Sequence, residues 1–153
     1  MNNEGTKGRR FGFDLPDGRS VSVPAEVEAL ATASVDAALA VHRELGPGLL
    51  ESAYEACLAH ELELRRITVQ RQLPVPLDYR GVRIEVGFRA DLLLDTRLLL
   101  ELKAVEAVSP LHRAQVITYL KLLKLPLGLL INFNSLLLKD GLERILNVPR
   151  RHP

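Results

Sequence analysis

DLLLDTRLLLELK, residues 91–103, is the stretch that decides the fold. Two leucine-rich runs lie on either side of the polar break at residues 95–97, and this pattern predicts a β-hairpin. The second run is apolar on both of its alternating faces, which is typical of an interior strand that is buried on both sides. Buried charges are costly unless they are paired or bind a metal. The stretch therefore leaves three charged residues to explain: Asp91, Glu101 and Lys103.

The loop of this hairpin decides whether the three charges can meet. Glu101 and Lys103 share one face of the second strand, because side chains alternate along a strand. A two-residue turn would place Asp91 on the opposite face, whereas a three-residue loop or a bulge brings it opposite Glu101 or Lys103. We predict an odd-length loop or a bulge between Leu94 and Leu99.

Two interpretations of these charges stay open at this point. The first is a structural salt bridge of Lys103 with Asp91 or Glu101. The second is a metal site, because one lysine does not neutralise two carboxylates at close range, and oxygen ligands with open water positions suit Mg²⁺ or Mn²⁺. A metal beside a lysine can support phosphodiester hydrolysis. The metal would lower the pKa of a bound water and neutralise the phosphate, while the lysine orients the nucleophile or stabilises developing charge.

Length and composition predict one soluble globular domain, since the chain has 153 residues, of which 47% are hydrophobic and 25% charged. A net charge of +1 gives no global signature of a polyanion partner, although local clusters of Lys and Arg can still bind nucleic acid. No apolar run approaches the roughly 20 residues of a membrane span, and we expect no membrane partner and no signal peptide. The single cysteine, Cys57, excludes an internal disulfide, fits a reducing cytoplasm and is expected to pack in a helix.

The order of elements predicts a mixed α/β domain with one sheet. Three helices are expected, at residues 25–45, about 49–66 and about 109–124. Strands are expected at residues 72–79, 82–86, 87–94, 98–103 and 125–133. Hairpins are expected around Pro16-Asp17-Gly18 and, within residues 136–146, at Asp140-Gly141, with the leucines of residues 136–138 forming an edge strand. The expected organisation is a tail with a small hairpin at residues 1–24, one domain at residues 25–148 and a basic tail at residues 149–153.

The third predicted helix carries two polar residues on its apolar face. Gln115 and Tyr119 lie four positions apart and so fall on the same side of the helix. They are either core groups with internal partners, or they reach the polar end of the sheet beside Glu101 and Lys103.

The second predicted helix also turns an acidic residue toward the core. Glu51 and Tyr54 open the stripe that faces the core, which makes Glu51 a third candidate carboxylate. A glutamate in the first turn is independently favoured by the helix dipole. Glu55, Glu61 and Glu63 fall off this stripe, and we expect them to be solvated.

These residues carry a resemblance to known families. Gly48-Leu49-Leu50-Glu51-Ser52-Ala53-Tyr54 matches the signature that names the GxxExxY protein family. Asp91, followed by Glu101-Leu102-Lys103, resembles the core motif of the PD-(D/E)XK nuclease superfamily. Gln115-Val116-Ile117-Thr118-Tyr119 looks like the QxxxY helix of its RecB-like branch. The resemblance to the GxxExxY family covers the chain from about Val35 to Asn147.

The resemblance implies a restriction-endonuclease-like core, with a central mixed β-sheet flanked by helices and the active site at one end. It implies that Asp91 and Glu101 hold Mg²⁺ or Mn²⁺ with help from the backbone carbonyl of Leu102. Lys103 would act on the attacking water, and Glu51 would be an extra ligand or would orient one.

The resemblance also implies roles for three residues on the helices. Gln115 and Tyr119 would position phosphate or brace the site, and Tyr54 would pack against them.

The leading hypothesis is therefore a metal-dependent nuclease that acts on DNA, with RNA as the less favoured substrate. A catalytically silent binding domain that keeps the nuclease fold is the alternative, and a hydrolase of another phosphoester is a third reading. The basic residues that could rim a groove, or that are ordinary solvated side chains, are Arg80, Arg83, Arg89 and Arg113. Superfamily members are often dimers, so a homodimer stays open.

Overall fold

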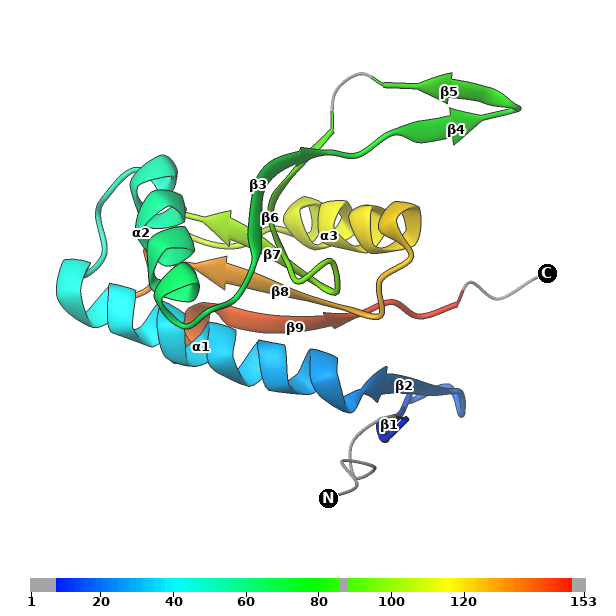
Figure 1. The fold of residues 1–153 in the computed structure, drawn as a ribbon, viewed down its shortest axis with the longest axis horizontal. Helices are drawn as coiled ribbons and strands as arrows, with labels where there is room; N and C mark the ends of the chain where they lie inside the picture. Colours follow the sequence, from blue (N-terminus) through cyan, green and yellow to red (C-terminus); the bar gives the residue numbers. More distant parts are fainter. Residues whose placement is uncertain (1–7, 86–87, 150–153) are drawn as a thin grey trace.

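The computed structural model describes residues 8–85 and 88–149 (Figure 1). Residues 1–7 and 150–153 of the two predicted tails, and residues 86–87 between two predicted strands, lie outside these ranges. The α-helices of the described part are α1 (Ala25–Leu45), α2 (Glu51–Leu64) and α3 (Pro110–Leu123). Its strands are β1 (Arg10–Asp14), β2 (Ser20–Pro24), β3 (Val69–Pro74), β4 (Leu77–Tyr79), β5 (Val82–Ile84), β6 (Arg89–Leu94), β7 (Leu98–Lys103), β8 (Leu127–Asn132) and β9 (Leu142–Leu146), with a 3₁₀ helix, η1 (Leu138–Gly141), before β9. None of the helices in this part combines the length and apolar character needed to cross a bilayer.

Local signals in the sequence account for the ends of the helices. α1 ends before Gly46, whose φ of +65° suits glycine at a helix C-terminus. α3 begins after Ser109, whose side chain accepts a hydrogen bond from the backbone N–H of His112 at 3.3 Å. Nδ1 of the His112 ring accepts a hydrogen bond from the backbone N–H of Ser109 at 3.1 Å, so the role of His112 is to cap the helix. The hairpin predicted around Pro16-Asp17-Gly18 is confirmed as the pair β1–β2.

A five-stranded mixed sheet forms the centre of the molecule (Figure 1). Its strand order is β3-β6-β7-β8-β9, with β7 and β8 parallel and the other pairs antiparallel. Leu98, Leu100 and Leu102 of β7 pack with α1 and α2 on one face of the sheet. Leu99 packs with Val116 of α3 on the other face. The predicted α/β architecture, a central mixed sheet with helices on both faces, is confirmed.

The β6–β7 hairpin has a three-residue loop. Leu94 pairs with Leu98, and the loop residues Asp95 and Thr96 have positive φ angles of 48° and 57°. Arg97 closes the loop with a hydrogen bond from its N–H to the carbonyl oxygen of Leu94 at 2.8 Å. The prediction of an odd-length loop is confirmed, and this register brings Asp91 opposite Glu101.

The expected strand at residues 72–79 is divided between two sheets, so the prediction of a single sheet is wrong. Pro74 and Pro76 have no backbone N–H to donate, and the ladder of the main sheet stops between them. The chain continues as β4, which pairs only with β5. The β4–β5 hairpin (residues 77–84, hereafter the arm) projects from the body of the molecule (Figure 1). Arg80 and Gly81 form its tight turn with φ angles of 48° and 82°.

The predicted C-terminal hairpin is also wrong in its pairing. β9 pairs with β8 rather than with residues 136–138, which form no strand. Leu136 is 85% exposed, whereas Leu138 is buried. The chain packs closely here: a Cβ on Gly141 would lie 2.5 Å from the carbonyl oxygen of Asn132, at the end of β8. Residues 133–141 therefore lie back against the end of β8, and the leucine run is not an edge of the sheet.

Helix α3 lies directly on β8. A Cβ on Gly128 would come within 3.0 Å of Cγ1 of Val116 and 3.3 Å of Cδ2 of Leu120. Both contacts are tighter than ordinary van der Waals distances, which fall near 3.5–4.0 Å. The missing side chain at Gly128 therefore sets how close α3 comes to the sheet.

Candidate active site

The carboxylates of Asp91 and Glu101 meet across the β6–β7 hairpin. The backbone N–H of Asp91 donates to Oε1 of Glu101 at 2.9 Å, and the N–H of Leu102 donates to Oδ2 of Asp91 at 2.8 Å. Each carboxylate is thus held by the backbone of the neighbouring strand. Glu101 is only 3% exposed and Asp91 is half-buried, so the two acidic groups (hereafter the carboxylate pair) lie at the boundary between core and solvent.

Burial makes this pair hard to ionise completely. Loss of solvation, followed by the charge of Asp91, raises the pKa of Glu101 from 4.5 to about 8. The hydrogen bond from the Asp91 backbone and the charge of Lys103 oppose this rise without cancelling it. At neutral pH the pair therefore retains a proton in the absence of another cation. Two adjacent oxygen donors with this excess negative charge fit a divalent cation such as Mg²⁺ or Mn²⁺.

Lys103 lies two residues beyond Glu101 on the same strand and is half-buried. In the described part of the chain it makes no ion pair within 4.0 Å, so the predicted salt bridge with either member of the carboxylate pair does not form. Its charge nevertheless lowers the pKa of Glu101 and of Glu51. The ammonium group of Lys103 is therefore close enough to influence the carboxylate pair electrostatically but forms no direct ion pair with it.

Glu51, the first residue of α2, approaches the same end of the sheet. Burial raises the pKa of its carboxyl, Lys103 lowers it, and Asp91 raises it again, which places Glu51 within electrostatic range of both. Over residues 8–85 and 88–149, no three His, Cys, Asp or Glu side chains form a group that could hold a metal. The structure therefore brings together a pair of carboxylates, with Glu51 outside it.

Helix α3, which covers the face of the sheet opposite α2, contributes the phenol of Tyr119. Tyr119 is 2% exposed, and its hydroxyl is joined to Nε2 of Gln115 at 3.0 Å. Burial is the first cause that raises the pKa of Tyr119, and the charges of Glu101 and Asp91 raise it further. Of the two helix positions predicted to reach the polar end of the sheet, Tyr119 is therefore within electrostatic range of the carboxylate pair, and Gln115 contacts Tyr119.

Tyr54 is not part of this arrangement, and the prediction that it packs against Gln115 and Tyr119 is wrong. α2 covers the opposite face of the sheet, where the ring of Tyr54 stacks on Phe133 with centroids 4.6 Å apart. Its hydroxyl donates to the carbonyl oxygen of Gly46 at 2.5 Å and accepts from the N–H of Leu49 at 3.1 Å. Tyr54 therefore fixes the loop from which α2 begins.

Two residues at the site were not anticipated. Nε2 of Gln72 donates to Oε2 of Glu55 at 2.9 Å and to Oδ1 of Asp91 at 3.3 Å. Glu55 is 7% exposed, so the expectation that it is solvated is wrong. Gln72 lies in β3 with a φ of +50°, a conformation that costs about 1–3 kcal/mol for a residue with a side chain.

The spacing of Glu55 could have revealed it, because it lies one helical turn after Glu51 and so on the same side of α2. No pattern in the sequence marks Gln72, because its role depends on a local backbone conformation. Glu55 therefore holds the amide of Gln72, and that amide in turn donates a hydrogen bond to Asp91.

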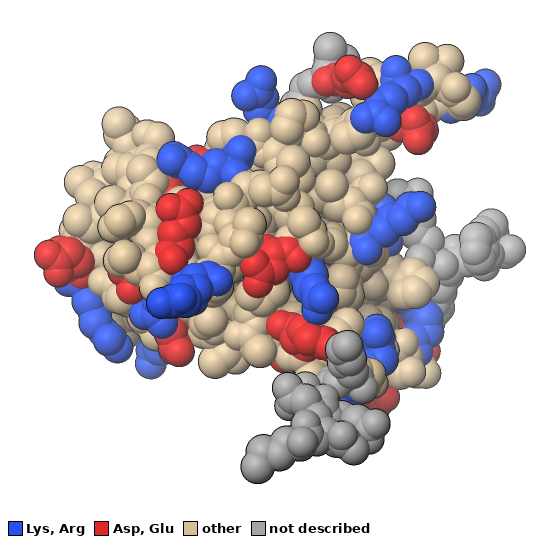
Figure 2. All heavy atoms as spheres, in the orientation of Figure 1, with Lys and Arg blue, Asp and Glu red and all other residues tan. Residues whose placement is uncertain are grey.

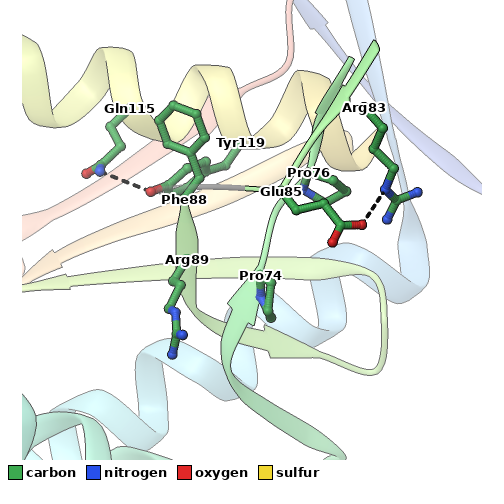
Figure 3. Close-up of a pocket in the computed structure, with 8 residues that line it drawn as sticks. All are labelled: Pro74, Pro76, Arg83, Glu85, Phe88, Arg89, Gln115 and Tyr119. Atoms are coloured by element: carbon green, nitrogen blue, oxygen red, sulfur yellow. Dashed lines mark hydrogen bonds and ion pairs between the residues drawn. The ribbon is translucent and has the colours of Figure 1, made fainter. Parts of the chain in front are cut away.

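A cleft opens between the arm and α3 (Figure 3). Its volume is about 780 Å³. The arm cleft is lined by residues of β3, the arm, the start of β6 and α3, namely Pro74, Pro76, Arg83, Glu85, Phe88, Arg89, Gln115 and Tyr119.

Of the four arginines proposed for a groove, Arg83 and Arg89 line the arm cleft. Arg80 lies over the ring of Tyr79, 5.7 Å from its centroid. Arg113 forms two hydrogen bonds of 2.7 Å with Glu143 and lies elsewhere on α3. Basic and acidic side chains are interspersed over the face shown in Figure 2, in keeping with the net charge of +1. The expectation that Cys57 packs in the helix is also wrong, because this side chain is exposed.

Comparison with known proteins gives one positive result. A family model described as the PD-(D/E)XK nuclease superfamily matches residues 28–145, more than half of the chain. The match runs from α1 to β9 and includes the carboxylate pair, Lys103 and α3. No curated protein and no solved structure matches the chain.

Proposed function

Because the chain belongs to the PD-(D/E)XK nuclease superfamily, we propose that it is a metal-dependent nuclease that hydrolyses phosphodiester bonds, with DNA as its leading substrate and RNA as the alternative. Its mixed sheet flanked by helices is the restriction-endonuclease-like core of that superfamily. Within the superfamily, the motifs around Glu51 and Gln115 lead us to propose the GxxExxY family and the RecB-like branch.

The observation that carries the proposal is the contact between Asp91 and Glu101. A pair in which burial and the charge of Asp91 raise the pKa of Glu101 to about 8 is costly for a purely structural site, whereas a divalent cation would offset its charge. Such a cation supplies neutralisation of the phosphate and a lower pKa for the attacking water. Lys103, which has no ion-pair partner among the described residues, is free to orient that water or to stabilise charge on the phosphate.

The remaining site residues have supporting roles in this proposal. Glu51 would orient a ligand or add one, since its carboxyl is within electrostatic range of Asp91. Gln115 and Tyr119 would position phosphate from α3, because their hydrogen-bonded side chains line the arm cleft and Tyr119 is within electrostatic range of the carboxylate pair.

The test is cleavage of linear, supercoiled and single-stranded DNA, and of RNA, with Mn²⁺, Mg²⁺ or EDTA. Lys103→Met should abolish cutting, because it removes the charge and keeps most of the side-chain volume. Lys124→Met is the matched control. Lys124 precedes β8, which runs parallel to β7, so it lies at the opposite end of the sheet from Lys103.

The outcomes separate the two leading hypotheses. Metal-dependent cutting that is lost in Lys103→Met and kept in Lys124→Met would support the nuclease. Cutting that both variants keep would point to a contaminating enzyme. Absence of cutting, together with no binding of Mn²⁺ or Mg²⁺, would favour a catalytically silent binding domain that retains the fold.

A further inference from the structure

The arm cleft combines two kinds of surface that nucleic acid recognises. Arg89 is exposed and makes no side-chain ion pair among the described residues. Arg83 is 65% exposed and pairs with one carboxylate, Glu85, at 2.9 Å. The ring of Phe88 meets Tyr119 edge-on with centroids 6.1 Å apart and forms the apolar part of the cleft, while the side chain of Arg89 extends away from this ring and Arg83 turns toward Glu85 (Figure 3).

We propose that the arm cleft binds a single-stranded segment of nucleic acid beside the carboxylate pair, an inference that rests on the proposed nuclease function. Guanidinium groups bind the phosphates of either a single strand or a duplex. Ring faces and proline edges contribute only when bases are unstacked, because the base faces of a duplex are covered by their neighbours. A cleft in which Phe88 and Pro76 lie among arginines therefore favours an unpaired strand.

The position of the cleft agrees with this occupant. Arg89 precedes Asp91 by two residues on β6, so a phosphate held by its side chain would lie near the strand that carries Asp91 of the carboxylate pair. Gln115 and Tyr119 belong to the cleft wall, and Tyr119 is also within electrostatic range of that pair. A strand in the cleft would thus run directly past the proposed point of cleavage.

The arm extends the same chemistry away from the body of the protein. Tyr79 and Val82 are 59% and 62% exposed, because the two-stranded arm pairs with no other strand of the described sheets, and both side chains are therefore accessible to a bound strand. The guanidinium of Arg80 lies over the ring of Tyr79. A ring and a cation at the tip of the arm would contact bases and phosphates farther along the strand.

The test is fluorescence anisotropy with a labelled oligo(dT) strand, and with the same strand annealed to oligo(dA), in EDTA so that metal-dependent cutting cannot occur. The single strand should bind at least about tenfold more tightly than the duplex, and Phe88→Ala and Arg89→Ala should each weaken its binding about tenfold. Arg65→Ala is the matched control, because it removes an arginine at the end of α2 whose partner is Glu61. It should change the affinity by less than about twofold.

Two results would overturn the proposal: equal affinity for duplex and single strand, or equal losses in Arg89→Ala and Arg65→Ala. Since Arg89 is exposed, its substitution leaves the core intact even where Phe88→Ala does not fold. DNA cutting by a protein whose strand binding is unchanged in Arg89→Ala would reject the cleft and keep the nuclease. Strand binding that depends on Arg89 in a protein that cuts no nucleic acid would reject the nuclease and keep the cleft as a binding site.

Discussion

Replacing Glu101 with glutamine should stabilise the metal-free protein at alkaline pH. Burial, with the charge of Asp91, raises the pKa of Glu101 from 4.5 to about 8, so the folded protein holds this proton more tightly than the unfolded chain does. The resulting cost to stability is absent below pH 4.5, grows as the pH rises toward 8 and is complete above it. Glutamine cannot ionise, and its side-chain oxygen can still accept the hydrogen bond from the N–H of Asp91.

The size of the effect follows from the two pKa values. A rise from 4.5 to about 8 corresponds to about 5 kcal/mol of unfolding free energy once the group is fully ionised, and to about 3 kcal/mol at neutral pH. We expect Glu101→Gln to recover on the order of 2–3 kcal/mol at about pH 9, because a buried amide also needs hydrogen-bond partners. Near pH 4.5 the two proteins should differ by less than about 0.5 kcal/mol.

Urea unfolding in EDTA, followed by circular dichroism at both pH values, measures this difference, and 2–3 kcal/mol moves the midpoint by about 1 M or more. Glu143→Gln is the control with the opposite sign. The hydrogen bond from Arg113 lowers the pKa of Glu143, so its stabilising effect is present above the ordinary pKa and is lost as the pH falls. That variant should lose less than about 1 kcal/mol at alkaline pH. If Glu101→Gln were no more stable than the wild type at alkaline pH, or gained equally at both pH values, the reasoning would be refuted.

Three further predictions follow from the site. Mn²⁺ at about one hundred times its Kd should raise the unfolding free energy by about 2.7 kcal/mol in the wild type but not in Asp91→Asn; scanning fluorimetry that finds no ion-dependent change in the wild type would contradict a metal site. Gln72→Leu removes the amide that donates to Glu55 and Asp91, so it should lower stability by about 1–3 kcal/mol and weaken Mn²⁺ binding in titration calorimetry; an unchanged Mn²⁺ affinity would show that Gln72 does not hold Asp91. Tyr54→Phe removes the hydroxyl that ties the loop before α2, so it should cost about 1–2 kcal/mol in urea unfolding and leave Mn²⁺ binding as it was; a weakened Mn²⁺ affinity would place Tyr54 in the site after all.

The central hairpin could be predicted because its determinants are local. Alternation of side chains assigned Leu98, Leu100 and Leu102 to one face and Leu99 to the other, as the packing confirms. The need to bring Asp91 opposite Glu101 then required a loop of odd length, and the register has one. In a strand, the neighbours of a residue follow from its position along the chain.

The errors arise where the answer depends on how elements connect. Helical periodicity showed that Tyr54 faces the core, but it does not show which face of the sheet its helix covers, and α2 and α3 lie on opposite faces. Gln72 reaches Asp91 only because its own backbone adopts a positive φ. No residue near Gln72 in the sequence predicts that backbone conformation. The arm was predicted to be part of the sheet because its strands have ordinary β patterns. The prolines at its base, which cannot donate a backbone hydrogen bond, mark the point where the main sheet ends.

Gly128 influences the geometry of the candidate site although it contacts none of the site's polar groups, because it sets the distance between α3 and the sheet. A methyl group at this position would push Val116 and Leu120 outward by a few tenths of an ångström. Gln115 and Tyr119 belong to the same rigid helix, so the phenol that senses the charge of Glu101 would move with them. A screen of variants for activity alone would then rank this buried glycine beside the acidic residues, and only a parallel measurement of folding would reveal that it acts as a spacer between two layers of the fold.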